Sequence, residues 1–546
     1  MPSYISLLRL KNFKPFGNNN IADVRLAPIT LIYGPNSAGK SSLVQALRLI
    51  RQSTNAFYAE HGKDNDITTR GGDVDLGGYL SIVHRHNPKA TLSIELQISD
   101  LTGDTDGTNI NYCFDYAAER EEENYRGVLK TIRISLTNIQ LRGSKCKGSI
   151  ELKRFEEPPS DFKTALNKKP GRPAQWAGGL FHTTKCNISK IASGLPNNTQ
   201  AAMYHSLNKF ISQLIFGRRP PADVKGYPEI FFGADYLPIA YIPSKLPPEF
   251  KDKLPIGSKE SKGGVADEAA LLRLGVSLNR PILFASRELE KTLRNFSYLG
   301  PLRAAPARIH ELTNDEIDGV GDQGEHAVRI LFKDSIRNRR GMKLIGLVNE
   351  FFIRLGIPYE LSIESLESKR EELSKSVIAM SLKDRRNRKL LVSPTDVGTG
   401  ISQLLPILVE GAAACATKQS RSSPTSLICV EQPELHLHPK LQAELADFFI
   451  LTKTTRDEPP AASQTSRIKG GVQWILETHS ETLMLRFQRR IREGTLSNKD
   501  LSVIYVDPLP NGGAQAFELR LGENGDFLDE WPAGFFEDAF NEKFSV

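Results

Sequence analysis

The fold is decided by the run Gly34-Pro35-Asn36-Ser37-Ala38-Gly39-Lys40-Ser41. It separates a short apolar run, Thr30 to Tyr33, from a helical pattern whose apolar face carries Leu43, Leu47 and Ile50. Glycines let the backbone curl so that N–H groups point at phosphate oxygens, the lysine reaches the β- and γ-phosphates, and the serine hydroxyl ligates Mg²⁺. The dipole of the following helix adds positive charge at the same place. We therefore predict an ATP-binding loop made by Gly34, Asn36, Ser37, Ala38, Gly39, Lys40, Ser41 and Ser42.

Size and composition indicate a soluble protein with more than one lobe. The chain has 546 residues, 39% hydrophobic and 25% charged, with a net charge of +7. This length is large for one compact core, and the mildly basic balance permits a polyanionic partner. The five cysteines form no CxxC pair, and no signal-peptide pattern opens the chain. The most apolar long window, 400–416, includes Gln403, Pro406 and Glu410 and falls short of a membrane span. We expect a cytoplasmic protein with no membrane partner.

Strand patterns dominate the first 155 residues. Residues 4–13 predict a strand, and three asparagines at 18–20 predict a turn into a second strand that leads to the phosphate loop. Further strands are predicted at 91–98, 110–116, 129–136 and 149–152. They favour an antiparallel sheet that flanks the nucleotide core. No heptad pattern repeats three times, which argues against a long coiled coil.

The sequence changes character in the middle of the chain. Residues 156–262 are rich in Pro, Gly and Lys, with 15 Lys and Arg against 9 Asp and Glu. We predict three segments: an N-terminal part of an ATPase head at 1–155, an inserted basic lobe at 156–296, and the C-terminal part of the head at 297–546. The basic lobe fits a nucleic-acid contact or a solvated surface without a ligand. Its hexapeptide 168–173 is also similar to a minor-groove AT-hook, a pattern short enough to recur by chance.

A metal-side acid is predicted far downstream of the phosphate loop. The apolar run Ser426-Leu427-Ile428-Cys429-Val430 ends in Glu431, which would reach Mg²⁺ directly or through water. A second buried strand is predicted at 474–479, and it would bring His479 to a γ-phosphate. The pair His436 and His438 could suggest a metal site, but zinc needs more ligands than this segment offers, so packing at a subunit interface is favoured.

A second anion-binding pattern precedes the helix that we expect to run to about Ala416. The run Asp396-Val397-Gly398-Thr399-Gly400-Ile401-Ser402-Gln403 combines glycines with a serine at a helix start. One ATP has no use for two such sites in one subunit. We therefore predict that this segment caps ATP bound to another subunit, with contacts from Gly398, Gly400, Ser402 and Gln403.

Together these motifs carry a family resemblance. The phosphate loop, the Gly-Ser segment, the run VEQPELHLHP at 430–439 and the strand ending in Thr-His-Ser resemble the ABC-type, AAA-family ATPases of the SMC, RecF and OLD group. Within that group, the motifs at 297–304 and 477–491 and the run WPAGFFEDAF are similar to the PtuA ATPases of Septu and retron-associated antiphage defence. The resemblance implies an α/β fold: an ABC-type P-loop ATPase head with a flanking antiparallel sheet and an inserted lobe.

The resemblance also implies roles for individual residues. Glu431 would take the place of the Walker B acid, Ser402 would donate to the opposite ATP, and His479 would be the switch histidine. Many relatives carry a second acid as general base where this chain has Gln432, which cannot accept a proton at neutral pH. Either Glu434 or a water chain would substitute, or hydrolysis would be slow.

Two functions remain open. The first is a regulatory ATPase, not itself a nuclease, that associates head to head as a homo-oligomer with ATP and Mg²⁺ and controls a separate HNH nuclease. A nucleic acid, or a complex of a retron reverse transcriptase with DNA, could join it. The second is a DNA-clamping scaffold of the RecF or SMC kind, which would bind DNA tightly, with ATP, and with steep salt dependence.

Overall fold

The computed structural model describes most of the chain outside its middle third. The described residues are 3–55, 67–100, 109–121, 123–141, 144–154, 181–189, 229–232, 238–239, 285, 288–305, 307–311, 319–337, 344–366, 377–387, 389–417, 425–454, 470–510 and 512–532. The chain forms two compact units. Unit 1 comprises Met1–Tyr4, Asp23–Val44 and Thr292–Val546, and unit 2 comprises Ile5–Ala22 and Gln45–Lys291.

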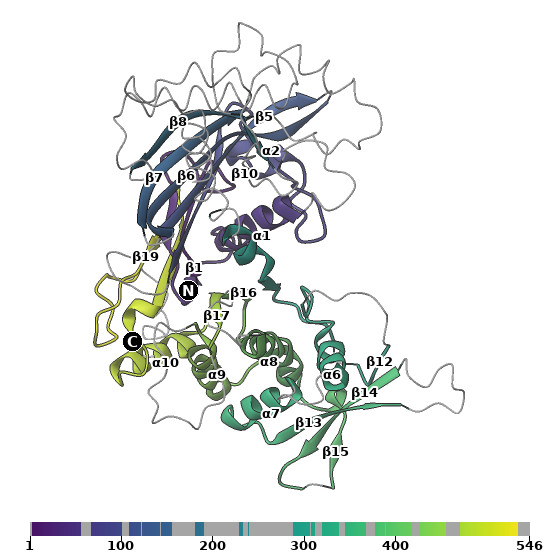
Figure 1. Ribbon diagram of the computed structural model, residues 1–546. Coiled ribbons are helices and arrows are strands. Elements are labelled where there is room, and N and C mark those ends of the chain that lie inside the picture. Colours follow the sequence, from purple (N-terminus) through teal and green to yellow (C-terminus); the bar gives the residue numbers. More distant parts are fainter. Residues whose placement is uncertain are drawn as a thin grey trace, which may run out of the picture. The chain divides into compact units, whose positions relative to one another are not determined.

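Unit 1 contains a six-stranded sheet in the order β11-β16-β17-β3-β18-β19. Strands β16, β17 and β19 of this sheet are labelled in Figure 1. Its strands are β3 (Ile29–Tyr33), β11 (Phe296–Leu299), β16 (Ser426–Glu431), β17 (Val472–Glu477), β18 (Leu501–Pro508) and β19 (Ala514–Glu518). Neighbouring strands are parallel except β18 and β19. All of β3 and β17 is buried, as their continuous apolar sequences require of a sheet covered on both faces. The carboxyl ends of β16, β17 and β3 therefore meet at one edge.

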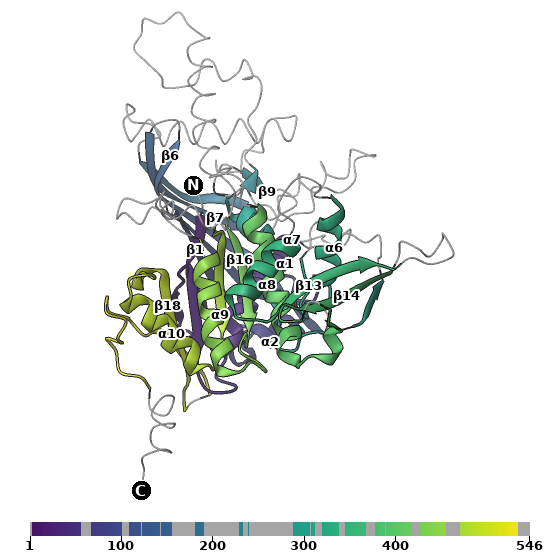
Figure 2. The same ribbon diagram turned by 90° about the horizontal axis from the view of Figure 1, so that it is seen from below.

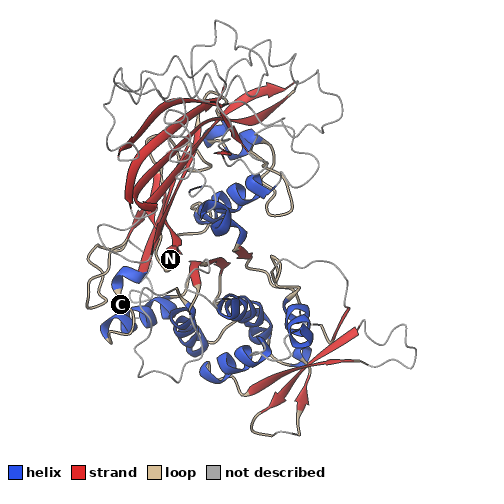
Figure 3. Cartoon of the chain, in the orientation of Figure 1, coloured by secondary structure: helices blue, strands red, loops and turns tan. Residues whose placement is uncertain are grey.

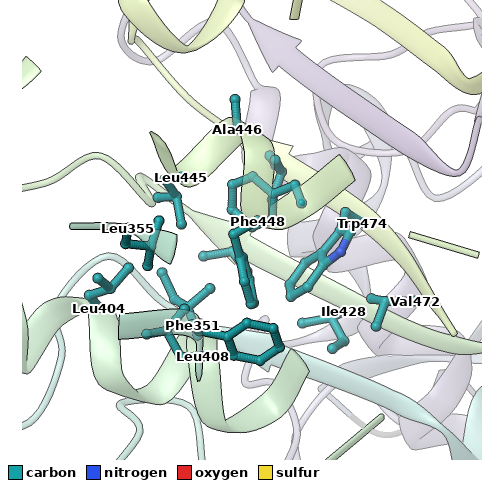
Figure 4. Packing of buried hydrophobic residues seen from close by; sticks show 14 of the residues in the cluster. Phe351, Leu355, Leu404, Leu408, Ile428, Leu445, Ala446, Phe448, Val472 and Trp474 are labelled. Carbon is teal, nitrogen blue, oxygen red and sulfur yellow. The ribbon is translucent and has the colours of Figure 1, made fainter. Parts of the chain in front are cut away.

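Helices pack on this sheet and enclose the main core. They are α6 (Ala327–Arg337), α7 (Leu344–Arg354), α8 (Thr399–Thr417), α9 (Pro439–Thr452) and α10 (Glu481–Arg492), with short 3₁₀ turns at Pro394–Asp396 and Asn498–Asp500. Figure 4 shows Phe351 of α7, Phe448 of α9 and Trp474 of β17 packed together. The indole N–H of Trp474 donates to Thr452 Oγ1 at 3.0 Å, so the buried ring leaves no polar atom unpaired.

Helix α8 crosses the centre of this core. It runs beside α9 (Figure 2), and a Cβ added at Gly411 would lie 2.6 Å from the Phe448 ring. Residues Thr399–Ala416 are the one described helical stretch that is long and apolar enough to cross a membrane, by length and composition only. A share of 61% of that stretch is buried inside the protein, so its apolar character is explained by packing.

A small antiparallel sheet completes unit 1. Its strands are β12 (Ile309–Glu311), β13 (Tyr359–Ser365), β14 (Val377–Asp384) and β15 (Leu391–Val392). Alternate residues of β14 are buried, because one face of this sheet packs on the core.

Unit 2 is built on a long antiparallel sheet, whose strands are red in Figure 3. The sheet order is β10-β9-β8-β7-β6-β5-β4-β1-β2. The strands are β1 (Ser3–Lys11), β2 (Ala22–Arg25), β4 (Leu92–Asp100), β5 (Asn109–Glu121), β6 (Asn124–Leu141), β7 (Ser144–Arg154), β8 (Phe181–Ser189), β9 (Glu229–Phe232) and β10 (Pro238–Ile239). The helices are α2 (Tyr79–Ile82), the 3₁₀ turn His84–His86, and α1 (Lys40–Asn55), which begins in unit 1.

The predicted α/β fold is confirmed, and the described residues include the predicted antiparallel sheet. The longest described helix, α8, has 19 residues, so no long coiled coil is present in the described part of the chain. The segment boundaries at 155/156 and 296/297 stay predictions, and the hexapeptide 168–173 with most of the basic lobe lies outside the described residues.

Candidate functional site

The phosphate loop joins β3 to α1 within unit 1. Three of its residues have positive φ angles: Gly34 at 143°, Ser37 at 64° and Gly39 at 101°. A Cβ added at Gly34 would lie 2.2 Å from the carbonyl oxygen of Val506 in β18, so only glycine fits there. Ala38 is buried and packs the loop onto the sheet, whereas Asn36 and Ser37 are exposed. The backbone curvature that a phosphate cradle needs is therefore built into the loop.

Lys40 is folded back over this loop. Its Nζ donates to the carbonyl oxygens of Gly34 at 3.0 Å and Pro35 at 2.9 Å, and the side chain is 4% exposed. Burial lowers the pKa of Lys40, and the charges of Glu477 and Glu431 oppose that effect. The Lys40 ammonium has three hydrogen-bond donors. In this position it can bind a phosphate while the main chain of the loop stays as it is.

Glu477 is the functional residue that sequence reasoning missed. It ends β17, and its Oε2 accepts a hydrogen bond from Ser41 Oγ at 2.9 Å while its Oε1 lies 3.9 Å from Lys40 Nζ. Desolvation, followed by the charge of Glu431, raises the pKa of Glu477 to about 7, against the hydrogen bond from Ser41 and the charge of Lys40. The signal in the sequence was a second apolar strand ending in an acid, Trp474 to Glu477.

Glu431 stands beside Glu477 at the same sheet edge. The two residues are direct partners in the parallel register of β16 and β17. Glu431 Oε1 accepts a hydrogen bond from the Tyr298 hydroxyl at 2.9 Å. Ser41, Glu431 and Glu477 thus bring a hydroxyl and two carboxylates together, which is the all-oxygen donor set that Mg²⁺ prefers. The residues present therefore fit a magnesium ion at the loop.

The residues after Glu431 turn sharply away from the strand. Gln432 has a φ of 46°, an uncommon backbone angle for a residue with a side chain, and its N–H donates to the carbonyl of Glu477 at 2.7 Å. Both carboxylate oxygens of Glu434 accept hydrogen bonds at 2.7 Å, from Thr478 Oγ1 and from the His479 N–H. Glu434 therefore holds the segment after β17 in place.

His479 follows that anchored segment. Its pKa is lowered from 6.5 by burial and then by the charge of Lys40, so the ring is neutral at neutral pH. The next residue, Ser480, caps α10 and accepts a hydrogen bond from the Tyr33 hydroxyl at 3.0 Å through its carbonyl. These contacts hold the backbone of His479 just beyond the carboxyl end of β17, the strand next to β3.

The Gly-Ser segment lies at the start of α8. A Cβ added at Gly400 would be 3.1 Å from the His436 carbonyl, so the helix start packs closely on the loop after β16. In the described part of the chain, Ser402 Oγ is buried without a hydrogen-bond partner. No hydrogen bond joins the described residues 398–403 to 34–42. Gly398, Ser402 and Gln403 are thus not part of the hydrogen-bonded cluster around Lys40.

The two histidines after β16 have local structural roles. His438 is the N-cap of α9, where its Nδ1 accepts from the Lys440 N–H at 3.3 Å. His436 has a φ of 60° and forms the turn against which Gly400 packs. Among the described residues, no group of three or more His, Cys, Asp or Glu side chains could hold a metal ion by themselves.

Comparison with known proteins agrees with this site. A protein-family model described as "AAA ATPase domain" matches residues 352–484, and one described as "AAA domain" matches residues 7–169. The first span includes Glu431 and His479, and the second includes the phosphate loop. Two separate segments of the chain are therefore similar to ATPase domains of the AAA type.

Solved structures of Smc head domains are similar over most of the chain. A head bound to the C-winged helix domain of ScpA is 12% identical, covering 95% of this chain and 98% of that chain with a TM-score of 0.34. The head domain from Thermotoga maritima is 10% identical, covering 95% and 100% with a TM-score of 0.32. No curated protein matches. These TM-scores assign no role to any residue of the site.

The carboxyl of Glu477 predicts a specific pH dependence. Its folded-state pKa of about 7 lies above the ordinary 4.5, so the folded protein binds more protons than the unfolded chain between these values. Its contribution to stability is complete below pH 4.5 and is lost as the pH rises through 7. Without nucleotide or metal, Glu477→Gln should be more stable than the wild type at pH 8 by up to about 3 kcal/mol and similar at pH 5. Urea unfolding followed by intrinsic tryptophan fluorescence, to which the buried Trp474 contributes, measures this.

The matched control for this change is Glu364→Gln, on an exposed position of β13. It should leave the pH dependence of the wild type unchanged. If Glu477→Gln and the wild type lose stability equally between pH 5 and pH 8, the carboxyl of Glu477 is not desolvated beside Glu431.

Proposed function

We propose that this protein is the regulatory ATPase subunit of an antiphage defence complex. Two copies associate head to head around ATP, hydrolyse it slowly, and thereby control a separate HNH-type nuclease. The observation that carries the proposal is the cluster of Lys40, Ser41, Glu431 and Glu477, together with a second anion-type segment, 398–403, that makes no hydrogen bond to it. A site of this kind is complete when a second copy supplies its own Gly-Ser segment.

Different residues of the site bind the phosphates, hold the magnesium ion and contact the terminal phosphate or its attacking water. Lys40 exchanges the carbonyls of its own loop for phosphate oxygens, and the curled loop adds N–H donors. Ser41, Glu431 and Glu477 would hold Mg²⁺, which, when bound, neutralises charge on the phosphate oxygens. His479, neutral and at the same sheet edge, donates or accepts one hydrogen bond at the terminal phosphate or its attacking water.

Slow hydrolysis is supported by the properties of Gln432 and Glu434, the two residues after β16 that were expected to activate the water. Gln432 orients a water but cannot accept its proton. Glu434 is unsuited to the task, because Thr478 and His479 occupy both of its oxygens. ATP binding therefore serves mainly to hold the two subunits together, and ATP hydrolysis is secondary.

Replacing Gln432 by glutamate should speed hydrolysis. The carboxylate would supply the missing general base, an effect that amounts to about a hundredfold when geometry is good. Phosphate release under saturating ATP and Mg²⁺ measures the change. Gln515→Glu adds the same charge at an exposed position of β19 and should have no effect. A Gln432→Glu protein no faster than the wild type would mean that another group already acts as the base.

Two parts of the proposed role, ATP-dependent dimerisation and the lack of nuclease activity, can be tested with this protein alone. We expect a non-hydrolysable ATP analogue to shift the protein from monomer to dimer in sedimentation velocity, with Mg²⁺ present. We also expect no cleavage of plasmid DNA by this protein without a nuclease partner. The similarity of its motifs to the PtuA ATPases supports the choice of an HNH enzyme as that partner.

Two outcomes would contradict the role. Robust metal-dependent DNA cleavage by this chain alone would make it a nuclease. Tight, ATP-dependent and steeply salt-dependent DNA binding by the dimer, with no response of an added HNH nuclease, would favour the DNA-clamping function.

A further inference from the structure

One buried cation beside the site has no assigned role so far. Arg303 follows β11 and is 8% exposed. Its Nη2 donates to the main-chain carbonyl of Glu431 at 3.2 Å. In the described part of the chain, its Nε and Nη1 have no hydrogen-bond partner. Burying a guanidinium with donors unpaired is unfavourable, so the arrangement indicates that a ligand completes it.

The position of Arg303 is fixed by its neighbours. Strand β11 pairs in parallel with β16, and Tyr298 of β11 donates to the Glu431 carboxylate. Beyond the strand, the N–H groups of Gly300 and Ala304 donate to the carbonyls of Asp322 and Gln323, both at 2.8 Å. The guanidinium is thus held on a braced segment, as a pre-organised binding group requires.

The charge pattern indicates which ligand is missing. Burial lowers the pKa of Arg303 to about 10, which still leaves it charged at neutral pH. The carboxylate of Glu431 acts electrostatically on both Arg303 and Lys40. Lys40 and Arg303 are thus two cations that act on the same carboxylate, and Arg303 also contacts the main chain of that residue. A bidentate guanidinium suits phosphate oxygens.

We propose that Arg303 binds the terminal phosphate of a nucleoside triphosphate and so distinguishes the triphosphate from the diphosphate. The proposal rests on the proposed ATP-binding function. Arg303 is a binding residue here, whereas Arg308, five positions along the same segment, is exposed and paired with Asp396 at 2.7 Å. Arg308 provides the matched control.

Arg303→Met keeps most of the unbranched apolar stem of the side chain and removes its donors. Isothermal titration calorimetry with ADP and with the β,γ-imido analogue of ATP, both with Mg²⁺, tests the proposal. We expect the affinity for the analogue to fall about ten- to a hundredfold, while the affinity for ADP stays unchanged. Arg303→Lys keeps the positive charge but not the planar pair of guanidinium donors, so its affinity for the analogue should fall less. Arg308→Met should bind both nucleotides as the wild type does.

Three outcomes would overturn the proposal. Arg303→Met could bind both nucleotides as the wild type does, or lose affinity for both equally. It could also melt far below the wild type without nucleotide, or fail to fold, which would make the buried guanidinium structural. By contrast, the proposed function itself fails if the wild type binds neither nucleotide, and that result is read from the first titration alone.

Discussion

We expect Lys40→Ala to abolish ATP binding and to lower hydrolysis by at least a factor of about one hundred. The ammonium that spans the Gly34 and Pro35 carbonyls is the charge that the phosphates meet on entering the loop. Its loss also removes the cation that lies 3.9 Å from Glu477 and acts electrostatically on Glu431, so the two carboxylates repel an incoming anion more strongly. Nucleotide binding by calorimetry and phosphate release measure the effect.

The control for this change is Lys440→Ala, at an exposed position in the first turn of α9. It removes one positive charge and should leave both measurements unchanged. If Lys40→Ala still bound and hydrolysed ATP near the wild-type level, the loop would have no part in the activity.

Ser402→Glu should be nearly as damaging, for a different reason. The serine hydroxyl is buried without a hydrogen-bond partner at the start of α8, where a helix dipole favours an anion. A carboxylate there would repel the terminal phosphate, and we expect at least a hundredfold, or about 3 kcal/mol, loss of hydrolysis. Dimerisation with the ATP analogue should fail as well. Ser402→Ala removes only one hydrogen bond and should lose much less.

Binding of the analogue by Ser402→Glu in the monomer should remain close to that of the wild type, because Lys40 and its loop are intact. A Ser402→Glu protein that still dimerises and hydrolyses normally would exclude residues 398–403 from the nucleotide site.

Much of the fold was predictable because its strands are strongly patterned. The run ending in Glu431 predicted β16 with both ends correct. Antiparallel strands were found where alternating patterns predicted them, although β7 is much longer than the predicted 149–152. Strand β17 ends at Glu477, two residues before the predicted end at His479.

The site was only partly predictable, because strand order is a property of the folded chain. Spacing along the sequence assigned the metal-side acid to Glu431. The sheet order β16-β17-β3 inserts Glu477 between that acid and the phosphate loop, and Ser41 bonds to Glu477. No local pattern in the sequence reveals that Arg303 is buried whereas Arg308 is exposed.

The central claim is that one ATP is held by the phosphate loop of one copy and residues 398–403 of another. Mixing the Lys40→Ala and Ser402→Glu proteins tests it directly, because a mixed dimer has one site with both defects and one site with neither. Neither single variant should dimerise with itself, so pairing should give mixed dimers with one intact site of two and restore up to about half of the wild-type ATPase activity per subunit. A Lys40→Ala/Ser402→Glu double variant mixed with either single variant should restore none. If the two single variants stay inactive when mixed, although mixed dimers form, the Gly-Ser segment acts within its own subunit and the claim is wrong.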